Sequence, residues 1–232
     1  MKNTYSCIIP AYNENLRMMD VIKAVSEVKE ITQILCCIDG DQSDSLIKAI
    51  KKQYPDIVLD VSEAKRGKAG AVLSGLNKAI NDEIILLDAD LLSLNSTEIG
   101  KAIKLFDDHG LDCLLLHTKA MNFSYFLTRK LFRSTMCVNG NRITKKELLL
   151  DALSIKKANG YQLEVAQNKY LMENNKKVAY YSISATDLGK TAKDGVLKGL
   201  VNEYKMWKQL VAYAGLPFFL KQSLFFAREK VD

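Results

Sequence analysis

The 232-residue sequence has no apolar run that could cross a membrane, and its cysteines are not spaced as a metal site. No segment reaches the roughly 20 unbroken apolar residues that a membrane-spanning helix needs. The first residues run into an expected strand without an apolar signal core, so we expect a cytoplasmic protein. Cys7, Cys36 and Cys37 lie within expected strands. We therefore expect buried, reduced thiols rather than disulfides or a zinc site.

The chain also lacks internal repeats, low-complexity tracts and any basic stretch with interleaved aromatics in its first 190 residues. Nucleic acid is therefore a poor partner. The composition is ordinary, with 48% hydrophobic and 26% charged residues, close to the averages of globular domains. A chain of this length can bury a large core, so we expect one large domain, or one domain with an appendage.

Strand and helix signals alternate along the first 120 residues. We expect strands over residues 4–9, 34–38, 57–61 and 114–118, and one strand that ends at Asp88. We expect helices over 15–29, over 45–53 with Asp44 as N-cap, over 67–80, and from a capping box of Asn95 and Glu98 to Asp108. This alternation predicts an α/β fold with a doubly wound, mostly parallel sheet and right-handed crossovers. After about residue 120 we expect helices and loops, with one strand over 178–183.

The most informative segment is the apolar run over residues 84–87, which ends in Asp88-Ala89-Asp90. Four consecutive large aliphatic residues predict a strand that is buried on both faces of a parallel sheet. Asp88 and Asp90 then emerge at the carboxyl end of a central strand, where open α/β sheets bind ligands. One carboxylate can contact a sugar or ribose while the other holds a hard divalent cation. The alternative is that the segment only caps a helix or starts a turn.

Three further segments come earlier in the chain. Pro10 lacks a backbone donor and should close the first strand, and the loop after it carries an aromatic residue and an acid suited to contact a base. The second strand also ends in acids, from Asp39 onward. Residues 65–71 open a helix with cations and small residues, which suits an anionic group at the positive end of the helix. Alone, each segment is a weak signal, and the first can be a turn that starts a helix, but their order before Asp88 is specific.

In these segments the chain resembles family 2 glycosyltransferases. The resemblance rests on Pro-Ala-Tyr-Asn-Glu at 10–14, Asp39, Lys-Arg-Gly-Lys-Ala-Gly at 65–70 and Asp-Ala-Asp at 88–90. It implies the single-domain GT-A fold over residues 1–190, with nucleotide-sugar binding over 1–120 and the acceptor side over 121–190. Gly40 replaces the family's usual second aspartate after Asp39, and Asp41 is shifted by one position.

The family pattern implies a role for each matching residue. The pocket for base and ribose would be lined by Pro10, Ala11, Tyr12 and Glu14, and Asp39 would accept a hydrogen bond from the base. Lys68 would lie near the nucleotide, Asp88 with Ala89 would contact ribose or donor sugar, and Asp90 would ligate Mg²⁺ or Mn²⁺. Asp88 is a second candidate ligand. Such a cation, with nearby Lys or Arg groups, would stabilise the charge that develops on the departing diphosphate.

The second half supplies candidates for the acceptor side. Glu164 lies at the start of an expected helix, in a segment that resembles the family's acidic segment near the acceptor. It is our candidate for the base or for an acid that binds the acceptor. Its alternative role is a favourable charge in the first helical turn. Residues 138–143 resemble a family loop beneath the acceptor and pyrophosphate, which makes Asn139, Gly140 and Arg142 candidates for acceptor or phosphate binding. The alternative is a turn with a solvated arginine.

No histidine follows the last expected strand, where family members often place a metal ligand. Asp187 stands at about that position. It is a candidate oxygen ligand, with a loop or cap role as the alternative.

Residues 191–232 are expected to form a basic amphipathic helical tail. Residues 190–232 hold eight Lys or Arg against four Asp or Glu, so +4 of the net charge of +6 lies there. Apolar residues repeat at helical spacing, and phenylalanines interleave with Lys221 and Arg228. Such a tail can lie on an anionic membrane surface, pack on the catalytic domain or form a homodimer.

Together these features predict a metal-dependent glycosyltransferase that takes a UDP- or GDP-linked sugar. It would move the sugar to a hydroxyl or phosphate acceptor. If the tail binds the inner face of a membrane, a lipid-linked acceptor such as a polyprenyl phosphate is a candidate. Two alternatives stay open: a nucleotidyltransferase, which usually carries a Gly-rich triphosphate loop after its first strand, and a non-catalytic module that binds a sugar nucleotide or a membrane.

Overall fold

The structure is a computed structural model, and it describes residues 3–12, 14, 16–40, 44–119, 138–155, 162–186, 205 and 208–232. The strands are β1 (Tyr5–Tyr12), β2 (Ile31–Asp39), β3 (Val58–Ser62), β4 (Glu83–Leu86), β5 (Cys113–Lys119), β6 (Arg142–Lys145), β7 (Val178–Thr186) and β8 (Glu229–Lys230). The helices are α1 (Met18–Ser26), α2 (Asp44–Gln53), α3 (Gly67–Lys78), α4 (Ser96–Asp108), α7 (Lys146–Ile155), α8 (Gln162–Glu173) and α11 (Leu216–Phe225).

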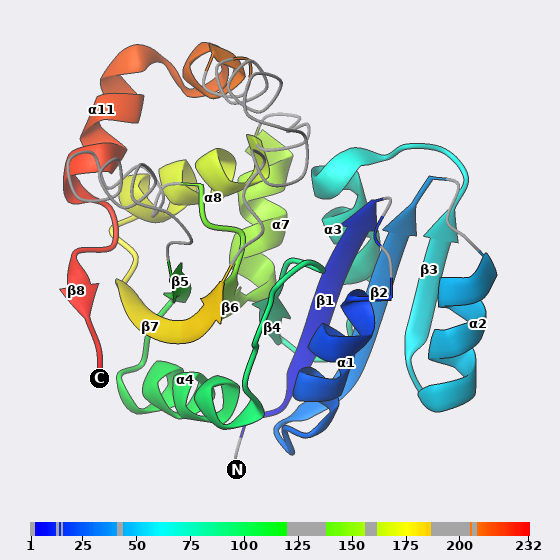
Figure 1. Ribbon diagram of the computed structural model, residues 1–232. Helices are drawn as coiled ribbons and strands as arrows, with labels where there is room; N and C mark the ends of the chain where they lie inside the picture. Colours follow the sequence, from blue (N-terminus) through cyan, green and yellow to red (C-terminus); the bar gives the residue numbers. More distant parts are fainter. Residues whose placement is uncertain are drawn as a thin grey trace.

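The strands form one sheet in the order β3-β2-β1-β4-β6-β5-β7-β8, with helices on both sides (Figure 1). Strands β1 to β4 pair in parallel, β6 is antiparallel to both β4 and β5, and β7 and β8 continue in parallel from β5. Side chains of α1, α2 and α4 pack on one face of the sheet, and side chains of α3, α7 and α8 on the other. The expected α/β fold with a mostly parallel sheet is confirmed.

The apolar run before Asp88 lies at the centre of this sheet. Ile85 and Leu87 belong to the core under α1 and α4, while Ile84 and Leu86 belong to the core under α3. This alternation follows because successive side chains of a strand point to opposite faces. Full burial stabilises each such side chain by roughly 1.5–3 kcal/mol relative to exposure. The strand is therefore fixed from both sides, and Asp88 leaves the sheet at a defined position.

The cysteines are as expected wherever the structure describes them. Cys7, Cys36, Cys37 and Cys113 are buried and free, and Cys137 lies outside the described residues. Burial raises the pKa of the Cys113 thiol to about 11. Because the thiolate is the reactive form, these thiols are inert core residues.

Two strands lie where the sequence predicts a loop or a helix. β6 begins at Arg142, inside the segment expected to be a loop, and pairs between β4 and β5. β8 brings the end of the chain back to the sheet beside β7, and Val231 is buried in the main core. The loop expectation for β6 is wrong because a four-residue strand with Arg and Lys at its ends shows no apolar run or alternation.

The expected capping box of α4 forms only in part. The side chain of Asn95 accepts a hydrogen bond from the Thr97 N–H at 2.8 Å, as an N-cap does. The Glu98 carboxylate instead accepts hydrogen bonds from Ser184 in β7, at 3.0 Å from the backbone N–H and 2.7 Å from the hydroxyl. Glu98 therefore ties α4 to the sheet and does not close a capping box. Asp44, expected as an N-cap, is itself the first residue of α2.

α11 has two different apolar faces. Phe218 and Phe219 pack near Val165 of α8. Leu216, Leu220 and Leu224, at helical spacing, are 56%, 55% and 55% exposed. Within the described residues, none of the helices combines the length and the apolar character needed to cross a membrane.

Candidate functional site

The parallel strands β1, β2 and β4 end at one edge of the sheet (Figure 1). Tyr12 at the end of β1 is in register with Asp39 at the end of β2. Asp88 and Asp90 follow the end of β4 and are both partly exposed, while Ala89 between them is buried. The sheet therefore gathers the expected donor-binding residues at the edge where such folds bind ligands.

Lys68 connects this edge to the second half of the chain. Its Nζ lies 2.6 Å from Oδ1 of Asp88 and 2.7 Å from Oε1 of Glu164. Lys68 lies in the first turn of α3, and Glu164 lies in the first turn of α8. Burial alone would lower the pKa of Lys68, but attraction to Asp88 and Glu164 outweighs burial and raises it. Lys68 is therefore charged, and two carboxylates from different halves of the chain share one ammonium.

The ion pair between Lys68 and Asp88 occupies the space where a side chain of residue 140 would lie, and Gly140 has none. A Cβ added to Gly140 would lie 2.3 Å from Nζ of Lys68 and 3.0 Å from both carboxylate oxygens of Asp88. These separations are well below the roughly 3.5–4 Å of favourable non-bonded contact. Any side chain at this position would therefore displace the Lys68 ammonium, the Asp88 carboxylate or both.

Two asparagines fix the backbone at Asp88. The Asp88 N–H donates to Oδ1 of Asn141 at 2.8 Å, and the Asn141 N–H donates to Oδ1 of Asn139 at 2.8 Å. Nδ2 of Asn139 donates to the carbonyl oxygen of Leu116 in β5 at 2.8 Å. Asn139, expected on the acceptor side, thus holds the loop that positions Asp88.

Arg142 is completely buried. Its Nη1 donates to Oε1 of Gln167 at 2.8 Å and to Oδ1 of Asn168 at 3.1 Å, and its Nη2 donates to the carbonyl oxygen of Asn139. The planar guanidinium therefore fastens α8 and the Asn139 loop to β6. A solvated arginine in a turn, the alternative considered from the sequence, is wrong because Arg142 has no exposed surface. Its expected role toward acceptor or phosphate stays a prediction.

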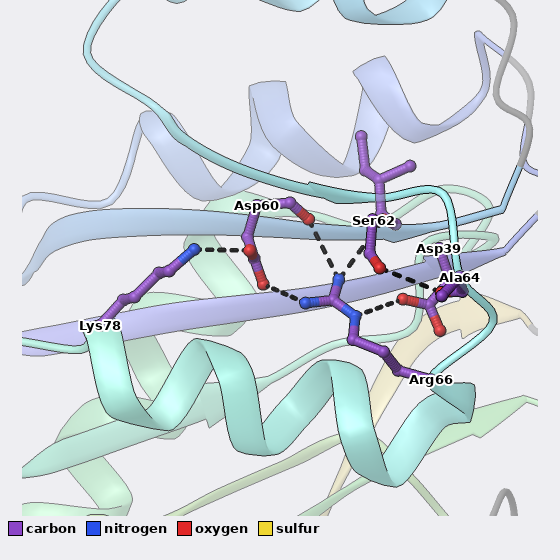
Figure 2. A network of polar contacts seen from close by, with 7 residues as sticks. Asp39, Asp60, Ser62, Ala64, Arg66 and Lys78 are labelled. Atoms are coloured by element: carbon purple, nitrogen blue, oxygen red, sulfur yellow. Dashed lines mark hydrogen bonds and ion pairs between the residues drawn. The ribbon is translucent and has the colours of Figure 1, made fainter.

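At the end of β2, the Asp39 carboxylate is held by Arg66 (Figure 2). Nε of Arg66 donates to Oδ1 of Asp39 at 2.7 Å, and Nη1 donates to Oδ2 of Asp60 at 2.7 Å. Nη2 reaches the backbone carbonyls of Asp60 at 3.2 Å and Ile38 at 3.4 Å. Because the guanidinium is planar, these contacts fix the orientation of Asp39, which is buried.

Asp60 is the anchor of this network. Nζ of Lys78, at the end of α3, lies 2.5 Å from Oδ1 of Asp60 (Figure 2). Burial alone would raise the pKa of Asp60, but hydrogen bonds from Lys78, Ser74 and Arg66 outweigh it and lower the pKa to about 2. Asp60 is thus ionised and holds Arg66 against Asp39.

The expectation that Pro10 closes the first strand is wrong, because β1 continues through Pro10 to Tyr12 and stays paired with β2 after its pairing with β4 has ended at Ile8. The end of β1 presents an exposed aromatic ring. Tyr12 is 46% exposed, and Nζ of Lys65 lies 4.1 Å from its ring centroid. Ala11 is buried, while Pro10 and Glu14 are half-buried. The ring of Tyr12 offers a flat apolar face next to Asp39, which suits a planar ligand.

The carboxylates that could hold a divalent cation follow β4. Among the residues that the structure describes, no cluster of three or more His, Cys, Asp or Glu side chains is arranged to hold a metal ion. Asp88 and Asp90 nevertheless fit Mg²⁺, which proteins commonly hold through one or two carboxylates together with phosphate oxygens of a substrate. Asp88 also carries the ion pair with Lys68, so a cation at this carboxylate would share it with the ammonium.

Asp187, the third candidate ligand, lies outside the described residues. The residue before it, Thr186, exchanges backbone hydrogen bonds with Leu92, with N···O distances of 3.0 Å in both directions. The end of β7 therefore lies beside the segment that follows Asp90.

Sequence reasoning missed Asp60 and the contacts made by Arg66 and Asn141. The signal for Asp60 was present, because it is an acid within the otherwise apolar segment over 57–61. An acid at such a position needs a cation to be buried. No comparable signal in the sequence indicates that Asn141 would hold the backbone at Asp88.

The chain matches the family described as "Glycosyl transferase family 2" over residues 6–156. The uncharacterized glycosyltransferase YaiP of Escherichia coli (strain K12) is 31% identical over 91 residues, which are 38% of this chain and 23% of that protein. The dolichol-phosphate mannosyltransferase of Saccharomyces cerevisiae is 27% identical over 117 residues, which are 47% of this chain and 43% of that protein. The alignments therefore span less than half the length of either relative.

Solved structures of glucosyl-3-phosphoglycerate synthase from Mycobacterium tuberculosis share the fold. The complex with Mn²⁺, UDP-glucose and phosphoglyceric acid has a TM-score of 0.70 at 18% identity, over 93% of this chain and 81% of that chain. The complex with Mg²⁺ and UDP has a TM-score of 0.62 at 18% identity, over 86% and 79% of the two chains. At this identity the likeness shows the fold alone, and it confirms the GT-A architecture expected from the sequence.

Proposed function

Because the chain belongs to glycosyl transferase family 2, we propose that it transfers a sugar from a nucleotide-diphosphate donor to a hydroxyl or phosphate acceptor. The observation that carries this proposal is the meeting of Asp88, Lys68 and Glu164. The Asp88 carboxylate at the sheet edge and the Glu164 carboxylate from the second half of the chain both contact the ammonium of Lys68. That arrangement suits a reaction in which a diphosphate leaves on one side while a hydroxyl is deprotonated on the other.

The donor nucleotide is assigned to the edge formed by β1 and β2. The Tyr12 ring offers a face for stacking, and Asp39, oriented by Arg66, can accept a hydrogen bond from a base N–H. Pro10, Ala11 and Glu14 complete this pocket in the proposal. The UDP and UDP-glucose complexes of the Mycobacterium tuberculosis enzyme support a uridine donor, with a guanosine donor as the alternative.

Mg²⁺ or Mn²⁺ is assigned to Asp90, with Asp88 and Asp187 as further candidate ligands. When bound, such a cation supplies positive charge to the departing diphosphate. The ammonium of Lys68 adds a second positive charge near the diphosphate. Lys68 lies in the first turn of α3, where the helix dipole also favours an anion. The Mn²⁺ and Mg²⁺ complexes of the Mycobacterium tuberculosis enzyme support this choice of metal.

The acceptor side is assigned to the segment around Glu164. Glu164 is the candidate base that takes the proton of the acceptor hydroxyl, and its side chain is 2% exposed. Asn139, Gly140 and Arg142 belong to a segment that approaches Asp88 at Gly140 and contacts α8 through Arg142, and their proposed role is to shape the acceptor side.

Two features distinguish a glycosyltransferase from the alternative functions: the sequence at the end of β1, and the release of nucleotide from the donor. Nucleotidyltransferases usually carry a Gly-rich triphosphate loop after the first strand, whereas β1 of this chain ends in Pro10, Ala11 and the exposed Tyr12 and is followed by Asn13 and Glu14. A non-catalytic module would bind the donor without releasing nucleotide.

The testing experiment incubates the protein with UDP-, GDP- and ADP-linked sugars and Mn²⁺, and measures the nucleotide diphosphate that is released. The proposal expects turnover of one donor class that Asp90→Ala abolishes. Release of no nucleotide from any donor contradicts it. Unchanged turnover by Asp90→Ala removes Asp90 from the metal role.

We also propose that α11 contacts an anionic membrane surface and that the acceptor is lipid-linked. The exposed leucines Leu216, Leu220 and Leu224 supply apolar area, and Lys221 and Arg228 are exposed cations beside them. The name of the yeast relative, a dolichol-phosphate mannosyltransferase, supports a lipid phosphate acceptor. A homodimer through the same leucines is the alternative.

A further inference from the structure

The ammonium of Lys68 lies between two groups that have different tasks in the proposed reaction. Asp88 belongs to the donor side, and Glu164 is the candidate base for the acceptor. The donor's diphosphate is itself an anion, and its assigned place is the start of α3, to which Lys68 belongs. A diphosphate and Glu164 therefore compete for the same ammonium.

We propose that Lys68 is a positioning residue that passes from Glu164 to the donor diphosphate when the donor binds. Without donor, Lys68 pairs with Glu164 and keeps this carboxylate from the acceptor. With donor bound, Lys68 turns toward the diphosphate, and the Glu164 carboxylate is released to take the acceptor proton. The inference rests on the proposed function and deepens it, because it predicts that the donor must bind before the acceptor reacts.

The burial of Glu164 makes this competition strong. The Glu164 side chain is 2% exposed, and its Oε2 has no hydrogen-bond partner. Within the described part of the chain, the ion pair that the structure gives Glu164 is the one with Lys68. Removal of a cation from a buried carboxylate is costly, so Glu164 holds Lys68 firmly until another partner compensates.

Gly140 provides the geometry that the exchange needs. A Cβ at this position would lie 2.3 Å from the ammonium and 3.0 Å from the oxygens of Asp88. The ammonium is the far end of a flexible side chain, so Gly140→Ala displaces the charge without requiring the backbone to move. Gly140→Ala therefore perturbs the position of Lys68 while all three charged groups remain.

The test is a double-mutant cycle on the binding of UDP and GDP, measured by calorimetry with Mn²⁺ present. Glu164→Gln removes the competitor, so we expect it to tighten binding of the accepted nucleotide about fivefold or more. Lys68→Met is expected to weaken binding about tenfold or more. In the Lys68→Met background, Glu164→Gln should have no further effect. Gly140→Ala should likewise weaken binding and abolish the effect of Glu164→Gln.

Matched controls separate these effects from general damage. Gly100→Ala introduces a Cβ that meets nothing within 4 Å, and Lys104→Met removes an exposed lysine of α4. Both should bind as wild type. Thermal unfolding checks that each variant is folded. If Lys68→Met does not fold, Gly140→Ala replaces it in the double-mutant cycle.

The inference is overturned if Glu164→Gln leaves binding unchanged or weakens it while Lys68→Met weakens it, because Lys68 is then a phosphate contact without coupling. The inference is also overturned if Glu164→Gln tightens binding by the same factor in the wild-type background and in the Lys68→Met background, because the effect of Glu164 then does not pass through Lys68. Failure of wild type to bind either nucleotide, or any sugar nucleotide, overturns the proposed function as well. The two failures are therefore distinguishable.

Discussion

Nε of Arg66 lies 2.7 Å from Oδ1 of Asp39, and this contact orients the carboxylate assigned to the donor base. Arg66 is held in turn by Asp60 on β3, at 2.7 Å. The side chains of Arg66, which caps α3, and of Asp60 on β3 thus determine where Asp39 points. The proposed base pocket depends on a residue, Asp60, that belongs to no expected site.

Arg66→Lys should weaken nucleotide binding although it keeps the charge. A single ammonium cannot form the planar fork that joins Asp39 and Asp60, so Asp39 loses its fixed orientation. We expect the Kd for the accepted nucleotide to rise about tenfold by calorimetry, with Arg228→Lys as control at an exposed position. Wild-type affinity in Arg66→Lys would show that the network does not serve the donor.

Asp60→Asn should destabilise the fold. The variant leaves Arg66 and Lys78 without their shared carboxylate, so we expect the free energy of unfolding at pH 7 to fall by about 2–4 kcal/mol in urea titrations. The pKa of Asp60 is lowered to about 2, so its contribution is present above its ordinary pKa of 3.8 and is lost as the pH falls through 2. Asp56→Asn, at an exposed position, should change little.

Glu83 should make the fold less stable as the pH rises. Burial raises the pKa of Glu83 from 4.5 to about 7, with Asp107 adding to the effect and Lys145 opposing it. Between these values the folded state binds more protons than the unfolded state, so the favourable contribution is complete below pH 4.5 and is lost as the pH rises through 7. Glu83→Gln should flatten this profile.

The size of the Glu83 effect is limited because the side chain is partly exposed. We expect Glu83→Gln to be more stable than wild type at pH 8 by on the order of 1 kcal/mol, after allowance for solvent screening. Urea unfolding at pH 5 and pH 8 measures the difference. Glu63→Gln is the exposed control, and a wild-type profile with no fall between these pH values contradicts the prediction.

The sequence predicts the first half of the fold well for a physical reason. The run over 84–87 is apolar at every position, and a short run of this kind between turn signals is typical of a strand covered on both faces. That placement fixes Asp88 at the sheet edge before any tertiary contact is known. The start of α3 at Gly67, as expected, places Lys68 near the same edge in the same way.

The second half of the chain is less predictable because its contacts join distant parts of the chain. β6 is short and charged at its ends, and it exists because β4 and β5 offer backbone partners on both sides. Arg142 is buried because α8 supplies Gln167 and Asn168 to receive its donors. The pairing of Lys68 with Glu164 depends on the packing of α3 near α8, which no local pattern encodes.

Leu220→Glu with Leu224→Glu should abolish membrane contact if α11 is the contacting surface. Each change places a charge on a face that would enter the lipid interface. The measurement is co-sedimentation with vesicles that contain phosphatidylglycerol, and Ile155→Glu, at another exposed apolar position, should bind as wild type. Equal binding by the double variant and wild type contradicts the proposal. Dissociation of a wild-type dimer by the same variant, in analytical ultracentrifugation, supports the dimer instead.

The central claim is that the acids after β4 gather a divalent cation that holds a sugar nucleotide. It is tested most directly by calorimetric titration of UDP-glucose and GDP-mannose into wild type and Asp90→Ala, each with Mn²⁺ and with EDTA. We expect affinity for one donor that depends on Mn²⁺ in wild type and is lost in Asp90→Ala. Binding of neither donor, or equal Mn²⁺-dependent binding by both proteins, would contradict the account.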